Sequence, residues 1–145
     1  MTKEALFAAT RTFIHAELMR RNFNVTESKS HISDFVNYFA EPQGSYLLLW
    51  YSLLFNVCAF LKNQNAIPES IKGDLPKVYE DMNDLRNVAF HIPPTFFDKR
   101  FDVLINPSAF STVCKIHETL QVFFDSELSR YGAETTLTWI RSERK

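Results

Sequence analysis

The sequence has few glycines, and this shortage excludes several classes of enzyme. Its 145 residues contain three glycines, which lie far apart at Gly44, Gly73 and Gly132. The glycine-rich loops that hold the phosphates of dinucleotides and nucleoside triphosphates need clustered glycines, so neither loop is present. The nucleophile elbow of α/β-hydrolases is excluded in the same way, because no pair of glycines flanks a serine.

The chain also lacks an excess of charge of either sign. Sixteen basic residues stand against seventeen acidic residues, which gives a formal net charge of -1. Proteins that bind nucleic acids without sequence preference depend on a strongly positive field. Any nucleic-acid site of this chain must therefore be a local patch.

Cysteine is scarce as well. Cys58 and Cys114 both lie in apolar surroundings, far apart in the sequence. This pattern is typical of free thiols in a reducing compartment and not of a disulfide framework. Lys3 and Glu4 precede any apolar run, so no signal peptide is predicted. We expect a cytoplasmic protein.

One segment, residues 46–61, carries no charged residue. A helix that crosses a membrane needs about 20 predominantly apolar residues, and this shorter segment also contains Ser52 and Asn56. The pattern therefore favours a helix buried at the centre of a bundle, with no membrane partner.

Apolar spacing and helix-capping residues predict an all-α fold over a single domain, residues 1–145. The expected architecture is an antiparallel bundle of about five main helices with a short C-terminal helix after Gly132. No alternating strand pattern competes with it. The five main helices are expected at 2–21, 30–41, 45–62, 74–91 and 107–131.

Three details of this prediction concern single residues. In the first helix, the spacing of the apolar residues at 6, 7, 13, 14, 18 and 19 predicts one buried side, which leaves Arg11, Glu17 and Arg20 for solvent. Asp74 is expected to cap the fourth helix. Asn106, followed by Pro107, is a strong start signal for the fifth.

Chemistry-bearing residues gather at the end of the fourth predicted helix. Arg86 has no carboxylate three or four residues away, so the usual ion pair within a helix is excluded. Asn87 and His91 are four residues apart and project from nearly the same side. Because Pro93 and Pro94 end the helix, His91 is expected in its last turn, at the rim of a cleft together with Arg86.

An Arg-Asn-x-x-x-His motif that closes a helix, in an all-helical domain of this size, resembles the HEPN (higher eukaryotes and prokaryotes nucleotide-binding) superfamily. That family is marked by an arginine, a polar neighbour and a histidine four to six residues further on, which here are Arg86, Asn87 and His91. The aromatic and charged run at 96–101 also resembles the segment that often follows the motif. The motif resemblance covers residues 75–105, and the rest is similar only in helical character.

The resemblance implies a metal-independent endoribonuclease, in which a ribose 2′-hydroxyl attacks its own phosphate and leaves a cyclic phosphate. Arg86 and His91 would be the catalytic pair and Asn87 their support. Family members usually dimerise with two motifs facing one cleft, so a homodimer is expected. RNA or a nucleotide would be the ligand, and an antitoxin or effector protein is a possible further partner. No cofactor is expected.

Two alternatives stay open at this point. The motif residues can instead tie their helix to a neighbour in a non-catalytic module that binds RNA, a nucleotide or a protein of a toxin-antitoxin or defence system. Lys99 and Arg100, interleaved with phenylalanines, are typical of single-strand RNA binding, although burial of those rings beneath a loop is the competing explanation. Cys114 and His117 have the spacing of metal ligands, but both fall on an apolar stripe and no second ligand pair exists, so core packing is expected and no metal site.

Overall fold

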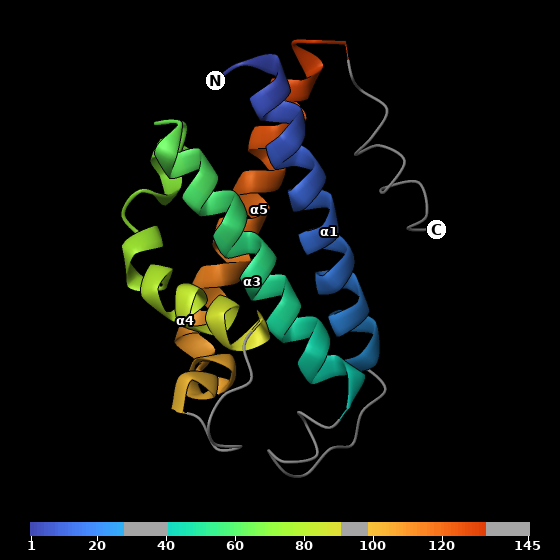
Figure 1. The fold of residues 1–145 in the computed structure, drawn as a ribbon, viewed down its shortest axis with the longest axis vertical. Coiled ribbons are helices and arrows are strands. Elements are labelled where there is room, and N and C mark those ends of the chain that lie inside the picture. Colours follow the sequence, from blue (N-terminus) through green and yellow to red (C-terminus); the bar gives the residue numbers. More distant parts are fainter. Residues whose placement is uncertain (28–40, 91–98, 133–145) are drawn as a thin grey trace.

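A computed structural model describes residues 1–27, 41–90 and 99–132 of the chain (Figure 1). Within these ranges every regular element is a helix, which confirms the predicted all-α class. The helix expected at 30–41 and the short piece after Gly132 lie outside the described residues. The described residues form the α-helices α1 (Lys3–Glu27), α3 (Pro42–Asn63), α4 (Tyr79–Phe90) and α5 (Pro107–Ser129), and the 3₁₀ helices η1 (Glu69–Ile71), η2 (Leu75–Lys77) and η3 (Lys99–Ile105).

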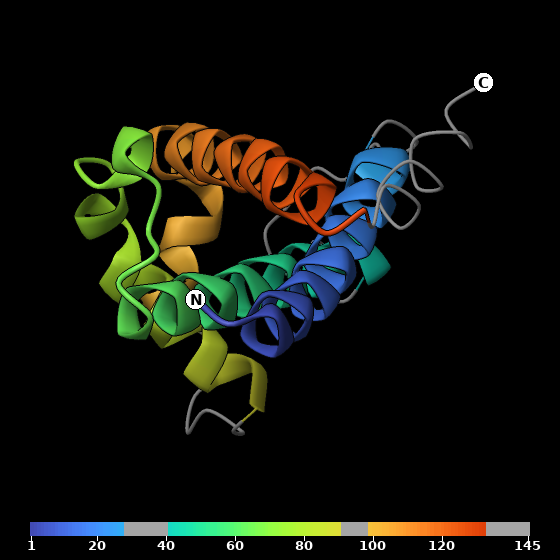
Figure 2. The ribbon, with the colours of Figure 1, turned by 90° about the horizontal axis from the view of Figure 1, so that it is seen from above.

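Helix α3 lies at the centre of the bundle, packed against both α1 and α4 (Figure 1). It runs antiparallel to α1, and α5 runs along the far side of the pair, as the view from above shows (Figure 2). Bulky side chains fill the space between α1 and α5: the Phe13 ring lies 4.7 Å from the His117 ring and 5.0 Å from the Phe124 ring. The buried apolar side chains of the helices and the connecting turns form one continuous cluster.

The central position of α3 follows from its composition. Leu47, Trp50, Tyr51 and Leu54 are all at most 1% exposed. The helix begins at Pro42, three residues before the predicted start, because proline fits the first turn, where its missing N–H is not needed. Among the described residues, it is the one helix that is long and apolar enough to cross a membrane by length and composition, and 56% of its most apolar window is buried within the fold.

Helix α1 differs from its prediction in length and in the face that it buries. It continues to Glu27 instead of ending near residue 21, because Phe23 extends the buried side by another turn. Phe7 and Leu18, which were assigned to the apolar side, are 39% and 38% exposed. The buried face is instead formed by residues at i, i+3 and i+4 spacing, and it includes Glu17, which was wrongly expected to face solvent.

The end of α3 is a Schellman turn, and it sets the direction of the connection to α4. Asn65 has a positive φ of 51°, a conformation that asparagine tolerates better than most residues. Its N–H donates to the carbonyl of Lys62, and the N–H of Ala66 donates to the carbonyl of Leu61. These two bonds satisfy carbonyls that the helix end would otherwise leave unpaired.

Asp74 does not cap α4, so this detail of the prediction was wrong. Its side chain makes no capping hydrogen bond, and η2 and Val78 separate it from the first residue of α4, Tyr79. The Asp74 carboxylate instead accepts from Lys77 at 2.6 Å and from Lys115 of α5 at 2.5 Å. Its pKa is lowered to about 2 by these hydrogen bonds, with that of Lys115 the stronger. Asp74 therefore links the connecting segment to α5.

The predicted start of α5 is confirmed, whereas the helix ends at Ser129, two residues before the predicted end at 131. The Asn106 side chain accepts from the backbone N–H groups of Ser108 and Ala109, as an N-cap residue does, and Pro107 is the first helical residue. Shortly after the last helical residue, Gly132 has a φ of 67°, a conformation that favours glycine.

Candidate functional site

Helix α4 holds Arg86 and Asn87 on the outer side of the bundle. Glu80 and Asp81 in its first turn suit the partial positive charge of a helix N-terminus. Met82, Leu85 and Val88 are buried, and this three-residue spacing fixes the rotation of the helix. The intervening Arg86 is therefore exposed and Asn87 is half-buried.

The two polar neighbours of the motif contact each other. An Nη1–H of Arg86 donates to the Oδ1 of Asn87 at 3.1 Å. Within residues 1–27, 41–90 and 99–132, no carboxylate pairs with Arg86, as its sequence neighbours predicted. A guanidinium has five N–H donors, so most of its donors are left for a ligand. The exposure expected of Arg86 is confirmed, whereas His91 lies outside the described residues.

Lys99 and Arg100 belong to η3 and line a hollow that does not include Arg86. The hollow has a volume of about 290 Å³ and is also lined by the carboxylates of Asp81, Asp84 and Asp102. Three acidic side chains thus face two basic ones. The hollow by itself does not attract a phosphate, because its carboxylates outnumber its cations.

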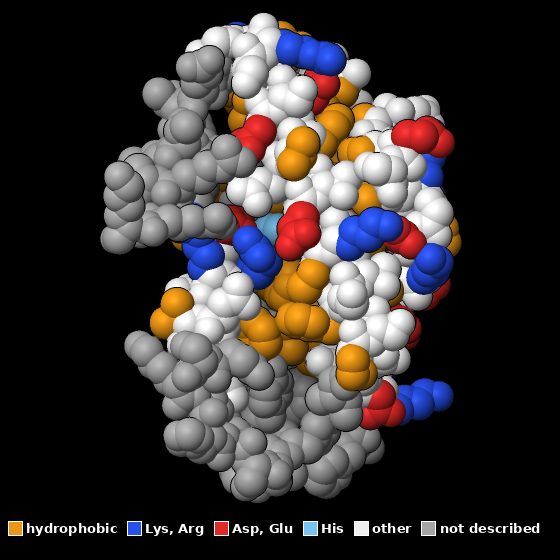
Figure 3. All heavy atoms as spheres, turned by 180° about the vertical axis from the view of Figure 1, so that it is seen from behind, with side chains coloured by type: hydrophobic (Ala, Val, Ile, Leu, Met, Phe, Trp, Pro, Cys, Tyr) orange, Lys and Arg blue, Asp and Glu red, His pale blue; other side chains and the backbone are white. Residues whose placement is uncertain are grey.

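The surface on the side opposite to the view of Figure 1 carries charges of both signs (Figure 3). Basic and acidic side chains alternate across its middle, and hydrophobic side chains lie exposed below them. This alternation agrees with the net charge of -1. No extended basic face forms on this side of the described residues.

A buried polar cluster, which sequence analysis missed, joins three helices. Trp50 of α3 donates through its indole N–H to Nδ1 of His117 at 3.0 Å, and Nε2 of His117 lies 2.8 Å from a carboxylate oxygen of Glu17. All three side chains are at most 1% exposed. The Glu17 carboxylate also accepts from Arg20 at 2.8 Å and from Arg21 at 3.0 Å. We call these five residues the Glu17–His117 network.

The hydrogen bonds of the network define its protonation. Because the Trp50 indole can only donate, Nδ1 of His117 accepts and its proton lies on Nε2, which donates to Glu17. Burial lowers the pKa of His117 and outweighs the hydrogen bond to Glu17, so the imidazole is neutral. Burial by itself would raise the pKa of Glu17, but hydrogen bonds from His117 and Arg20 lower it to about 2.

This arrangement is a structural tie and not a catalytic dyad. Both nitrogens of His117 are engaged and the side chain is 0% exposed, so no substrate reaches it. The burial of His117 that its apolar stripe predicted is confirmed. Within the described ranges, no three histidine, cysteine, aspartate or glutamate side chains gather as metal ligands.

The cysteines are not poised as nucleophiles. Both are free thiols, as predicted. Burial raises the pKa of Cys58 to about 12, and it also raises the pKa of half-buried Cys114. Since the thiolate is the reactive form, neither side chain is activated at neutral pH.

The network predicts a loss of stability in acid. The unfolded chain takes up a proton on His117 near its ordinary pKa of 6.5, whereas the folded chain excludes that proton. The free energy of unfolding is therefore expected to fall as the pH drops below about 6.5. It falls again between pH 4.5 and about 2, the ordinary and folded pKa values of Glu17, where the second step is worth roughly 3 kcal/mol.

Urea unfolding at a series of pH values measures both steps. The matched control is His117→Gln, because the amide can accept from Trp50 and donate to Glu17 but does not titrate. In this variant, the loss of stability that begins near pH 6.5 should lack the His117 contribution. The loss between pH 4.5 and about 2, which comes from Glu17, should remain. An identical pH profile in the variant would show that His117 contributes nothing to acid sensitivity.

Comparison with known proteins gives no match: no family model, no curated protein and no solved structure is similar to this chain.

Proposed function

We propose that this chain is a metal-independent RNA-cleaving domain of the HEPN type, with Arg86 and His91 as its catalytic pair. The observation that carries the proposal is the exposed Arg86 guanidinium, which no carboxylate among the described residues neutralises. An arginine that no described carboxylate neutralises is available to bind a phosphate bidentately.

The reaction would proceed by internal attack. A ribose 2′-hydroxyl attacks the adjacent phosphorus, its proton passes to a base, and the bond from phosphorus to the 5′-oxygen of the next nucleotide breaks as that oxygen takes up a proton. A histidine is suited to either proton transfer because its ordinary pKa is about 6.5. Arg86 would stabilise the charge that builds on the phosphoryl oxygens, and Asn87 would hold its guanidinium in place.

One chain supplies a single motif, so a base and an acid would come from the two histidines of a homodimer. Two copies of Arg86 would then face the same phosphate, which compensates for the small net charge of each chain. Activity is therefore expected to depend on the dimer. The activity per chain should fall when the protein concentration is lowered below the dissociation constant of the dimer.

The test is cleavage of a panel of single-stranded RNAs by the purified protein in excess EDTA. The expected products carry a 2′,3′-cyclic phosphate on one fragment and a 5′-hydroxyl on the other, and the rate is unchanged by the chelator. RNA with a 2′-O-methyl group on every ribose is the matched control, because it keeps the charge but lacks the nucleophile. The proposal fails if every RNA stays intact, or if the methylated RNA is cut at the same rate.

A second candidate function, a protein-binding module without catalysis, is favoured by Phe90. This side chain is 60% exposed and lies four residues after Arg86, on the same side of α4. Aromatic side chains and arginine dominate the centres of protein interfaces. A protein that cuts no RNA, but whose complex with a partner is weakened by Phe90→Ser, would support this candidate instead.

A further inference from the structure

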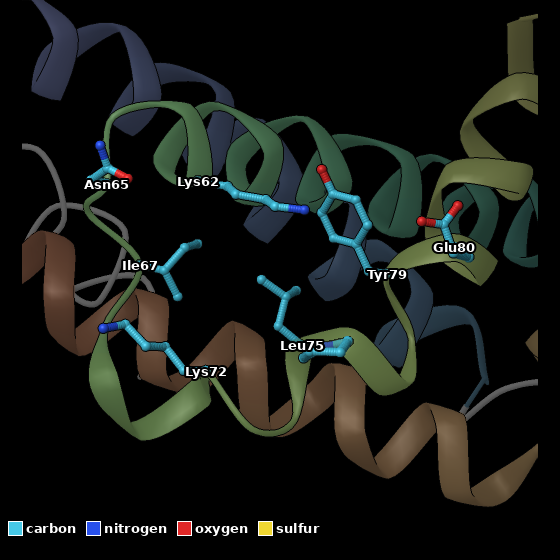
Figure 4. A pocket seen from close by; sticks show the side chains of 8 residues that line it. Lys62, Asn65, Ile67, Lys72, Leu75, Tyr79 and Glu80 are labelled. Atoms are coloured by element: carbon cyan, nitrogen blue, oxygen red, sulfur yellow. The ribbon is translucent and has the colours of Figure 1, made fainter.

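A pocket of about 430 Å³ lies where the end of α3, the connecting turns and the start of α4 meet (Figure 4). The side chains of Ile67 and Leu75 point into it, and the Tyr79 ring forms one wall. The pocket belongs to the opposite end of α4 from Arg86 and shares no lining residue with the hollow at Lys99. Its volume falls within the range of small-molecule sites.

The apolar part of the pocket is built by the turns around it. The Schellman turn at Asn65 ends α3 and reverses the chain, which brings Ile67 back over the pocket. The η2 turn places Leu75 opposite, where it is anchored at 6% exposure. Tyr79 is held from behind by Phe55, whose ring lies 5.0 Å from its own. A ligand would therefore meet preformed apolar walls.

Ionisable side chains stand around these walls. Lys62 extends from α3 across the pocket, with its ammonium 4.5 Å from the centre of the Tyr79 ring (Figure 4). Lys72 stands on the other side, in an exposed ion pair with Glu69. Glu80 contributes the carboxylate of the lining. Glu69 neutralises Lys72, whereas no carboxylate among the described residues pairs with Lys62, so Lys62 is the ammonium that an anion can reach.

We propose that this pocket binds a small organic monocarboxylate with a flat apolar body. The body would lie against Ile67, Leu75 and the Tyr79 ring, and the carboxylate would pair with the ammonium of Lys62. A monoanion matches the one ammonium of the lining that no described carboxylate pairs with, whereas a phosphate dianion would leave one charge uncompensated beside Glu80. Lysines supply point charges and no bidentate fork, which also suits a carboxylate that is bound at one end.

The probe is 1-naphthoate, titrated into the full chain and followed by backbone amide NMR shifts and by calorimetry. A ligand of this size is expected to bind with a dissociation constant of about 0.1 to 1 mM. The largest shifts are expected at Ile67, Leu75 and Tyr79. Neutral 1-naphthamide should bind at least fivefold more weakly, because it keeps the ring but loses the charge.

A lysine variant with a matched control tests the ion pair. Lys62→Met keeps the apolar stem of the side chain and should weaken naphthoate binding by about tenfold, the effect of one charge-assisted contact. Lys77→Met removes another exposed lysine, which is not part of the lining, and should change binding by less than twofold. Circular dichroism and the urea midpoint show that both variants fold.

Three outcomes would overturn the proposal. They are naphthoate shifts that fall elsewhere in the chain, naphthamide binding as tight as naphthoate binding, and an equal effect of the two lysine variants. Tighter binding of 1-naphthyl phosphate than of naphthoate would overturn the assignment to monocarboxylates. None of these results depends on RNA cleavage, so the pocket is tested independently of the proposed nuclease.

Discussion

Replacing Glu17 with alanine is expected to lower the free energy of unfolding by about 3–5 kcal/mol, the usual cost of removing one partner of a buried ion pair. The carboxylate accepts hydrogen bonds from His117, Arg20 and Arg21 and is 1% exposed. In the variant, the Nε2–H of His117 stays buried without its acceptor, and the two arginines lose their common partner. The arginine side chains are 16% and 24% exposed, so water compensates part of their loss and little of that of His117.

Urea unfolding at pH 7 of the wild type and three variants measures this effect. Glu4→Ala removes an exposed carboxylate from the first turn of the same helix and should cost less than about 1 kcal/mol. Glu17→Gln should cost less than Glu17→Ala, because the amide oxygen still accepts from His117 while the charge is lost. Equal stability of the Glu17→Ala and Glu4→Ala variants would show that the network contributes nothing to the fold.

The paired variant Glu17→Leu with His117→Leu examines the coupling between the two side chains. Replacing both partners of a buried pair by apolar groups often costs less than removing one. The indole N–H of Trp50 is then left without an acceptor, which costs about 1–3 kcal/mol. We therefore expect the double variant to be more stable than the sum of the two single variants predicts.

The burial of Glu17 in the Glu17–His117 network was not predicted from the sequence. Glu17 was assigned to solvent because the apolar residues at 6, 7, 13, 14, 18 and 19 were placed together on the other side of the helix. A signal was present, however: Glu17 lies four residues after Phe13 in the register of the buried face, and Arg20 and Arg21 follow at i+3 and i+4. Its partner on α5, His117, is 100 residues away, and no local pattern connects the two.

Helices with local signals were predicted well. The start of α5 has such a signal, because Asn106 caps the helix and Pro107 fits its first turn. Beyond the end of α5, Gly132 adopts a positive φ that glycine tolerates. The start of α4 was not predicted, because the competing use of Asp74 is a long-range one. Lys115 of α5 donates to the Asp74 carboxylate, so this side chain binds a residue of another helix and does not cap the N-terminus of α4.

In the candidate site, too, local properties were predicted and long-range contacts were not. The exposure of Arg86 followed from the absence of carboxylates around it, which is a local property. The acidic neighbours of Lys99 and Arg100 did not follow, because Asp81 and Asp84 come to them from α4 through the packing of η3. Two adjacent basic residues in a sequence therefore do not predict whether the surface around them is positively charged.

The second large effect is expected in catalysis. His91→Ala should lower the rate of RNA cleavage by about 10²–10⁴, the contribution typical of one acid-base group. Arg86→Ala should lower it by about 10²–10³, as loss of one preorganised charge at the transition state does. Arg86→Lys keeps the charge but loses the planar fork that can donate to Asn87 and to a phosphate at the same time, so it should keep only part of the rate.

Matched variants on α1 separate chemistry from contamination and from misfolding. His15→Ala and Arg11→Ala remove an exposed histidine and an exposed arginine far along the sequence from the motif, and both should leave the rate within twofold of the wild type. Single-turnover cleavage in EDTA, with unfolding midpoints for each protein, makes the comparison. If His91→Ala cuts RNA as fast as His15→Ala does, the activity belongs to a contaminating nuclease, and Phe90 with its exposed ring becomes the better guide to what this surface of α4 binds.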